Sequence, residues 1–145
     1  MRSLPKDFSY EIERQVVASM TADQWGNPTP AQVLATPVLL QLFEQCAAEG
    51  ILPYLNSDEL ILGAEVVLQH RRPTPPGFTL HVKTRLLRLS ANKLTFDLEA
   101  WDGMDVVATG TLTSAVVSRS SFETRFAEKF RIAEDLAKDV PHARP

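Results

Sequence analysis

The sequence predicts an α+β fold in which a twisted antiparallel sheet wraps around one long, buried helix. Three observations lead to this expectation. A strongly apolar helical segment lies at residues 35–50, strand-like segments follow it between residues 60 and 117, and no repeat or linker divides the chain. The 145 residues are enough to bury one hydrophobic core, so we expect a single domain over residues 1–145.

The helix is the clearest element of the chain. Its sequence is ATPVLLQLFEQCAAEG, in which Thr36 is a good N-cap, Pro37 suits the first helical position and Gly50 suits the C-terminal stop. Apolar side chains occupy most of its circumference: Leu39, Leu40, Leu42, Phe43, Cys46 and Ala47. A helix that is apolar on nearly every side is buried rather than half-solvated.

The rest of the chain contains the signals of several strands and loops. Residues 10–18 are a possible first strand, and residues 21–30 are a loop rich in turn-forming residues. Residues 60–69 are almost continuously apolar, and the prolines of RRPTPPG end this strand because proline cannot join a sheet interior. Residues 78–89 and 93–101 alternate between apolar and polar side chains, as a half-buried strand does.

Two signals complete the chain. Asp102-Gly103 predicts a hairpin turn that leads to a last strand over residues 106–117. Residues 121–139 have the spacing of an amphipathic helix, so we expect a terminal helical extension over about residues 120–145. One helix followed by an antiparallel meander is the order of the hot-dog architecture. Such folds usually pair because a second copy covers the exposed sheet edge, so we expect a homodimer.

Composition argues against several classes of partner and site. The 15 Lys and Arg against 18 Asp and Glu give a formal net charge of -3, which offers no general attraction to nucleic acid or to an anionic membrane. Cys46 is the single cysteine and the 3 histidines are widely spaced, so we expect neither a disulfide nor a metal site. We expect a cytoplasmic protein, because no signal peptide and no apolar run of roughly 20 residues is present.

Three side chains could carry chemistry. Glu44 interrupts the apolar helix, where it either touches water at a helix edge or faces a cleft as a general base or charge stabiliser. Thr36 is either an N-cap alone or a hydroxyl beside free N–H groups that stabilise a developing oxyanion. His70 ends a strand before the proline loop, where it is either structural or catalytic. Together, a hydroxyl, a carboxylate and an imidazole are the parts that acyl transfer needs.

The sequence resembles the fluoroacetyl-CoA thioesterase family, a group of small hot-dog thioesterases, over roughly residues 10–130. The stretches that carry the resemblance are LATPVLLQLFEQCA, PYL at residues 53–55, LGAEVVLQHRRPTPPG, and the DG hairpin followed by GT at residues 110–111. In the family, a catalytic Thr or Ser is followed by a Glu 8 residues later and by a His 26 residues beyond that. Thr36, Glu44 and His70 reproduce both intervals. The resemblance implies that these three residues are catalytic and that the substrate approaches the backbone at Gly63.

Two stretches depart from the family pattern. The last strand of the family commonly reads G-T-H-x-R, with the Arg contacting the CoA part or the acyl end of the substrate, whereas this chain has Leu112 and Ser114 at those two positions. The fluoroacetyl-specific member has a phenylalanine-rich lid before the helix, whereas this chain has WGNPTPAQV with Trp25 as its only aromatic residue. The implied activity is hydrolysis of a small acyl thioester, without selectivity for a fluorinated acyl group.

Coenzyme A is highly anionic, so an acidic protein needs a local basic rim to bind it. Arg71 and Arg72 directly follow His70 and are the candidate substrate-binding residues. A further basic group on the next strand is either a second part of this rim or a solvated strand face: Lys83, Arg85 and Arg88. We expect no cofactor other than the coenzyme A of the substrate.

Three alternatives to a thioesterase remain at this point. The first is a non-catalytic protein that binds acyl-CoA or another small ligand, which the loss of the arginine at Ser114 favours. The second is another hot-dog enzyme, such as an enoyl-thioester hydratase, although no Asp/His pairing of that kind is present in the sequence. The third is a purely structural dimer, which leaves Glu44 unexplained.

Overall fold

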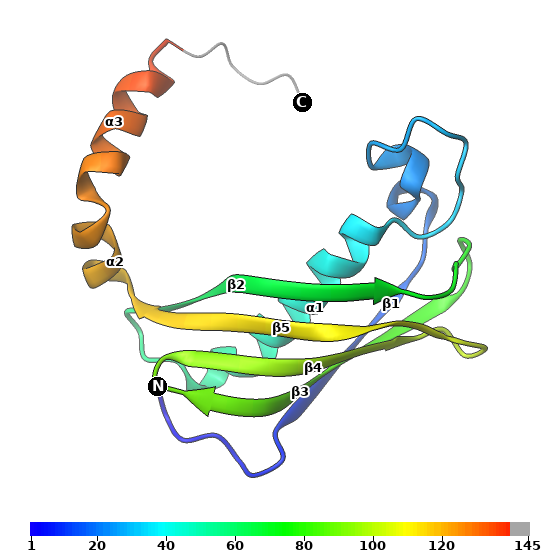
Figure 1. Cartoon of the computed structure of the whole chain (residues 1–145), viewed down its shortest axis with the longest axis horizontal. Coiled ribbons are helices and arrows are strands. Elements are labelled where there is room, and N and C mark those ends of the chain that lie inside the picture. Colours follow the sequence, from blue (N-terminus) through cyan, green and yellow to red (C-terminus); the bar gives the residue numbers. More distant parts are fainter. Residues whose placement is uncertain (140–145) are drawn as a thin grey trace.

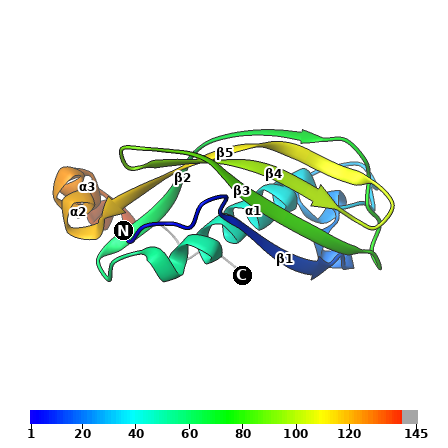
Figure 2. The same cartoon turned by 90° about the horizontal axis from the view of Figure 1, so that it is seen from below.

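A five-stranded antiparallel sheet curves around one long helix, α1 (Thr36–Ile51), in the computed structural model, which describes residues 1–139 (Figure 1). The strands are β1 (Ser9–Gln15), β2 (Glu59–His70), β3 (Thr79–Ser90), β4 (Lys93–Trp101) and β5 (Val106–Ser118). Seen at a right angle to that view, α1 lies against one face of the bent sheet (Figure 2). The predicted α+β hot-dog arrangement is therefore confirmed, and the first strand begins and ends slightly earlier than residues 10–18.

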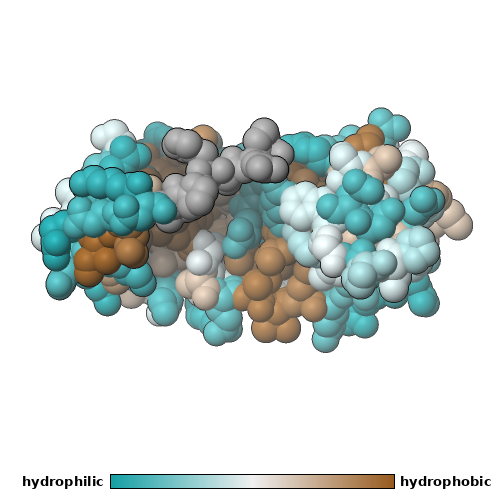
Figure 3. Space-filling model, turned by 90° about the horizontal axis from the view of Figure 1, so that it is seen from above, coloured by the Kyte–Doolittle hydropathy of each residue, from teal (hydrophilic) through white to brown (hydrophobic). Residues whose placement is uncertain are grey.

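Strand β2 forms an open edge of the sheet. The strand order is β1-β3-β4-β5-β2, so β2 pairs with β5 alone within residues 1–139. Its middle carries apolar side chains that the sheet does not cover: Leu62, Val66 and Val67 are 40%, 37% and 54% exposed. Apolar surface is visible near the middle of this side of the molecule and on the terminal helices (Figure 3).

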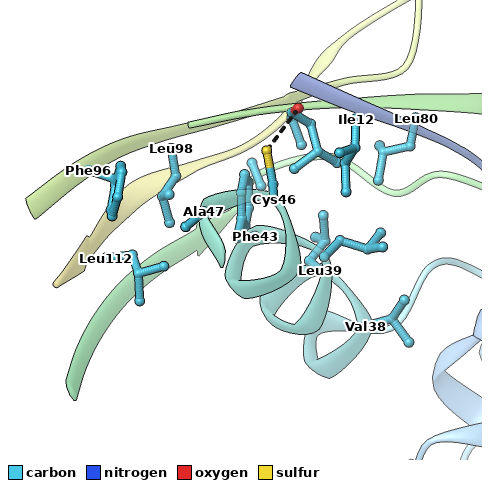
Figure 4. Close-up of a cluster of buried hydrophobic side chains, with 14 of the residues drawn as sticks. Ile12, Val38, Leu39, Phe43, Cys46, Ala47, Leu80, Phe96, Leu98 and Leu112 are labelled. Atoms are coloured by element: carbon cyan, nitrogen blue, oxygen red, sulfur yellow. Dashed lines mark hydrogen bonds between the residues drawn. The ribbon is translucent and has the colours of Figure 1, made fainter. Parts of the chain in front are cut away.

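The core lies between α1 and the concave face of the sheet. Leu39 and Phe43 of the helix are fully buried against strand residues such as Leu80 and Leu98 (Figure 4). Cys46 lies in the same layer, with its sulfur 3.4 Å from the carbonyl oxygen of Tyr10. Burial raises the pKa of the Cys46 thiol, which makes it a packing residue rather than a reactive one.

Both predicted ends of the helix are wrong in detail. Ala35 occupies the N-cap position. Thr36 is already the first helical residue, and its hydroxyl contacts His70 instead of capping the helix. Gly50 does not stop the helix, which continues to Ile51 and then into a 3-10 turn, Leu52–Tyr54. A Cβ atom at Gly50 would lie 2.7 Å from the Cβ of Tyr10, so a glycine stands there because β1 crosses the helix closely.

Two further 3-10 turns, Ala18–Met20 and Ala22–Gln24, precede α1. After β5 the chain forms α2 (Arg119–Arg125) and α3 (Ala127–Ala137) instead of one continuous helix. The break is at Phe126, whose φ of -110° and ψ of 18° are not helical. Residues 140–145 of the predicted extension lie outside the described residues. No helix of the described chain is long and apolar enough to cross a membrane.

Candidate active site

The hydroxyl of Thr36 and the imidazole of His70 are in direct contact. Their Oγ1 and Nδ1 atoms are 2.8 Å apart, although the two residues are separated by 34 positions in the chain. Thr36 begins α1 and His70 ends β2, so the pair joins the N-terminus of the helix to the end of the edge strand. The structure therefore brings together two of the three residues that the sequence singled out.

Backbone hydrogen bonds hold this pair in place. The start of α1 is fixed on two sides, because Ala35 N donates to the carbonyl of Met20 over 2.9 Å and Leu34 N donates to that of Thr74 over 2.8 Å. On the other side, Arg71 N donates to the carbonyl of Val107 over 2.7 Å, which fixes the chain directly after His70. The pair is positioned by backbone contacts from several elements rather than by the two side chains alone.

His70 is half-buried, and this burial lowers the pKa of its imidazole below the ordinary value of 6.5, an effect that a backbone hydrogen bond with Arg72 opposes in part. The ring is therefore mainly neutral at pH 7. A neutral imidazole with an unprotonated Nδ1 accepts the hydrogen of the Thr36 hydroxyl, which is the arrangement in which a histidine polarises an alcohol.

Glu44 lies over the backbone of Gly63 on β2. An added Cβ at Gly63 would be 3.3 Å from the Glu44 Cδ and would collide with the carboxylate oxygen, so a glycine leaves room for the carboxylate in this position. Glu44 is exposed, which agrees with a helix edge that touches water. Among the described residues, Glu44 takes part in none of the ion pairs.

Within one chain, Glu44 does not join the Thr36–His70 pair. Eight residues of α-helix separate Thr36 from Glu44, which is about 12 Å along the helix axis. The two groups also line different hollows: His70 faces one of about 680 Å³ with Arg71 and Arg72, and Glu44 faces one of about 480 Å³ with Gly63. These two separate groups, Thr36 with His70 and Glu44 with Gly63, are called here the half-sites of the candidate active site.

Arg71 and Arg72 are exposed beside His70, where a basic rim was predicted. Arg71 is held by its neighbours, because its Nε donates to Thr109 Oγ1 over 3.0 Å and a terminal nitrogen donates to Gln69 Oε1 over 2.6 Å. No acidic side chain pairs with either arginine within residues 1–139. Their charges are therefore available to an anionic ligand.

The second basic group belongs to the solvated face of the sheet. Lys83 Nζ lies 3.8 Å from a carboxylate oxygen of Glu11, and a terminal nitrogen of Arg85 lies 3.5 Å from one of Asp97. Arg88 reaches the hydroxyl of Thr95. These contacts favour the interpretation as a strand face over the interpretation as a rim.

Asp102 was predicted only as part of a turn, yet it also holds the loop that follows His70. It is 7% exposed and accepts hydrogen bonds from the backbone N–H groups of Met104 and Asp105 and from the hydroxyl of Thr74. Burial alone would raise the pKa of this carboxyl, but the hydrogen bonds outweigh it and lower the pKa. The Asp-Gly signal predicted the turn, but it could not show that Asp102 also bonds to Thr74 in the proline loop. Within residues 1–139, no group of three His, Cys, Asp or Glu side chains could hold a metal ion.

Comparison with known proteins identifies the family of this chain. The family described as fluoroacetyl-CoA-specific thioesterase matches residues 16–120. The fluoroacetyl-CoA thioesterase of Streptantibioticus cattleyicolor is 31% identical over 98 residues, which are 68% of this chain and 70% of that protein.

Solved structures give the same picture. A structure of the fluoroacetyl-CoA thioesterase FlK superposes with a TM-score of 0.80 at 25% identity and covers 88% of this chain and 98% of that chain. A Thermus thermophilus protein described as a thioesterase superfamily member has a TM-score of 0.82 at 24% identity, covers 93% of this chain and 99% of that chain, and supports the fold. This chain belongs to the fluoroacetyl-CoA-specific thioesterase family and is a thioester hydrolase.

Proposed function

We propose that the protein hydrolyses a small acyl-CoA thioester with Thr36, Glu44 and His70 as its catalytic residues. The observation that supports this most directly is the 2.8 Å contact between Thr36 and His70 at the N-terminus of a buried helix. In the reaction, the oxygen of water adds to the thioester carbonyl and the carbon–sulfur bond breaks. The products are a carboxylic acid and the thiol of coenzyme A.

Each residue has a role that suits its surroundings. The first turn of α1, which begins at Thr36, stabilises the developing oxyanion through its free N–H groups and the positive end of the helix dipole. His70 accepts the hydrogen of the Thr36 hydroxyl and so fixes the hydroxyl oxygen beside the thioester carbonyl. Glu44 removes a proton from the attacking water as a general base.

A homodimer would bring the two half-sites together. Pairing β2 with β2 of a second copy in antiparallel fashion about a two-fold axis between Val66 and Val67 would set His70 opposite Gly63 of the partner subunit. Glu44 lies over Gly63 in its own chain, so each Thr36–His70 pair would then meet the carboxylate of the other chain. The same pairing would cover the exposed apolar side chains at the middle of β2.

Arg71 and Arg72 are proposed to bind the phosphates of coenzyme A at the mouth of the site. Both are exposed beside His70, and guanidinium groups bind phosphate through paired hydrogen bonds. A cytoplasmic location, where CoA esters are available, is part of the same proposal.

Replacement of Glu44 tests the function. In an assay that detects free thiol from a panel of acyl-CoA and acyl-carrier thioesters, Glu44→Gln should lower kcat by about 100-fold or more, because the amide cannot accept the proton. The matched control is Glu49→Gln on the same helix, whose carboxylate accepts a hydrogen bond from Gln45 over 2.7 Å. The control should retain activity within about threefold, since surface substitutions of this kind have small effects.

Undiminished hydrolysis by Glu44→Gln would refute the assignment of Glu44. A wild-type protein that binds acyl-CoA in calorimetry but releases no thiol would instead support the binding-protein alternative. That alternative draws on Ser114, which stands where the family pattern has an arginine.

A further inference from the structure

A pocket of about 480 Å³ lies next to Glu44, between α1 and the β2 edge. Its size is within the range of small-molecule sites, which is roughly 300–1,000 Å³. The walls beyond the carboxylate are made by small or apolar residues: Ala48 from the helix, Ile61 and Gly63 from β2, and Ser114 from β5. Because Ala48 follows Glu44 by one helical turn, it lies on the same side of α1 as the carboxylate.

Ser114 forms a notch in the inner face of β5. Alternate residues of a strand share a face, and the neighbours of Ser114 on this face, Leu112 and Val116, are 1% and 7% exposed. Ser114 is itself only 3% exposed, and its strand partner across β2 is Gly63, which has no side chain. Among the three inward-facing residues Leu112, Ser114 and Val116, the shortest side chain therefore lies opposite the residue over which Glu44 rests.

The hydroxyl of Ser114 opens into the pocket. In the part of the chain that the structure describes, it makes no hydrogen bond with another protein group, whereas every fully enclosed polar side-chain atom has a partner. The neighbouring Thr113, which faces the other way, contacts Thr95 Oγ1 over 3.3 Å. Because no fully enclosed polar atom lacks a partner, water reaches this hydroxyl through the pocket, and an acyl group in the pocket can lie against it.

The wall of the pocket beyond Glu44 is uncharged. Among residues 1–139, Glu44 is the only ionisable residue that one chain places in the lining. An acyl chain would place its methylene groups against Ala48 and Ile61.

We propose that Ser114 sets the depth of the acyl pocket, so that the enzyme prefers an acyl group longer than acetyl. This inference rests on the proposed thioesterase function, and it concerns the substrate class of that same site. The reacting carbonyl lies beside Glu44, and the acyl chain extends from it across Gly63 towards Ser114 and Ala48.

The test compares acetyl-, propionyl-, butyryl- and hexanoyl-CoA by thiol release. For the wild type, kcat/KM should rise from acetyl to butyryl or hexanoyl. Ser114→Leu should lower kcat/KM for the longer chains by at least about tenfold while changing that for acetyl-CoA by less than threefold, since each misfitted methylene costs about tenfold or more. Ala48→Met, which fills the pocket from the helix side, should produce the same shift and serves if Ser114→Leu does not fold.

Two controls separate pocket depth from other effects. Ala115→Leu adds the same bulk at the next β5 position, which faces away from the helix, and should leave the chain-length profile unchanged. Ser114→Ala should keep the profile as well, because it does not fill the notch. An equal loss for all substrates in Ser114→Ala, or a wild type that prefers acetyl-CoA, would overturn the proposal.

Failure of the proposed function would be distinguishable. If the wild type releases no thiol from any of the esters, the thioesterase assignment fails, and calorimetric titration with the same esters still reports the pocket. Tighter binding of butyryl-CoA than of acetyl-CoA, lost in Ser114→Leu, would support the acyl pocket on its own. Equal binding of all the esters would overturn it.

Discussion

The two half-sites of this chain are held in place by different means. Thr36 and His70 are joined by a 2.8 Å hydrogen bond, and the backbone around both residues is tied to neighbouring elements. Glu44 has no counter-ion among the described residues and rests over the bare backbone of Gly63. One half is a fixed hydrogen-bonded pair, and the other is a carboxylate positioned by close packing.

In the proposed function, this difference identifies the group that a second chain would supply. The fixed pair is complete inside one chain, but Glu44 does not belong to it, because this residue lies about 12 Å further along the helix. The carboxylate faces the open edge of the sheet, where a second copy can approach. A substitution in the fixed pair should therefore remove a group that takes part in the proposed reaction. One at Gly63 should instead displace the Glu44 carboxylate.

Mixing two inactive variants should give the largest effect. Thr36→Ala and Glu44→Gln dimers should each have less than about 1% of the wild-type activity. Random exchange of subunits should restore about a quarter of it, since half of the dimers are then mixed and each mixed dimer has one intact composite site. The measurement is thiol release from acyl-CoA after co-refolding of the two variants at equal concentration.

The matched control is a mixture of Thr36→Ala with His70→Gln. These two residues come from the same half-site, so no intact site can form in the mixed dimer, and activity should stay at background. If the first mixture also stays at background although mixed dimers form, Glu44 acts within its own chain and the composite site is wrong.

A methyl group at Gly63 should have the next largest effect. The added Cβ would collide with the Glu44 carboxylate, which is the mobile end of a long side chain and would be displaced while the backbone stays in place. Gly63→Ala should therefore lower kcat by roughly tenfold, since misplacing a catalytic group by about 1 Å costs up to about 100-fold. The melting temperature should not fall, because alanine also restricts the unfolded chain.

Gly110→Ala is the contrasting variant. A Cβ there would collide with the backbone carbonyl of Val67, which cannot move without parting β2 from β5. Overpacking of this kind destabilises a fold by about 1–3 kcal/mol, so thermal unfolding should separate the two glycines. Full activity in Gly63→Ala would show that the position of the Glu44 carboxylate does not matter.

The sequence allowed the element order and the three catalytic candidates to be predicted, because both depend on local patterns. The apolar helix and the alternating strands have distinct periods, and Thr36, Glu44 and His70 have a characteristic spacing. It could not show that His70 contacts Thr36 rather than Glu44, since this depends on where the end of β2 meets the helix. The sequence also does not distinguish a glycine that ends a helix from one that leaves room for a crossing strand. The prediction that Gly50 ends the helix was therefore wrong.

The smallest expected effect concerns the protonation of the fixed pair. Burial lowers the pKa of His70 below 6.5, so the neutral ring that accepts the Thr36 hydroxyl persists to more acidic pH. The acid limb of the kcat/KM profile should therefore be centred below pH 6.5, at the lower pKa of folded His70. Titration of the ring protons by NMR follows His70 directly and should give the same midpoint.

The stability of the protein should also fall at acidic pH, so this loss must be separated from the loss of catalysis. Because the folded state favours the neutral ring, the contribution of His70 to folding is fully present above pH 6.5, the ordinary value of the unfolded chain, and is lost as the pH falls through the lower folded pKa. Melting curves across this pH range show whether the activity is lost only because the protein unfolds. His81→Gln, on the outer face of β3 with its ring 3.2 Å from Glu13, is the control and should leave the acid limb in place. An acid limb centred at or above pH 6.5, in a protein that is still folded, would contradict a buried, neutral His70 as the partner of Thr36.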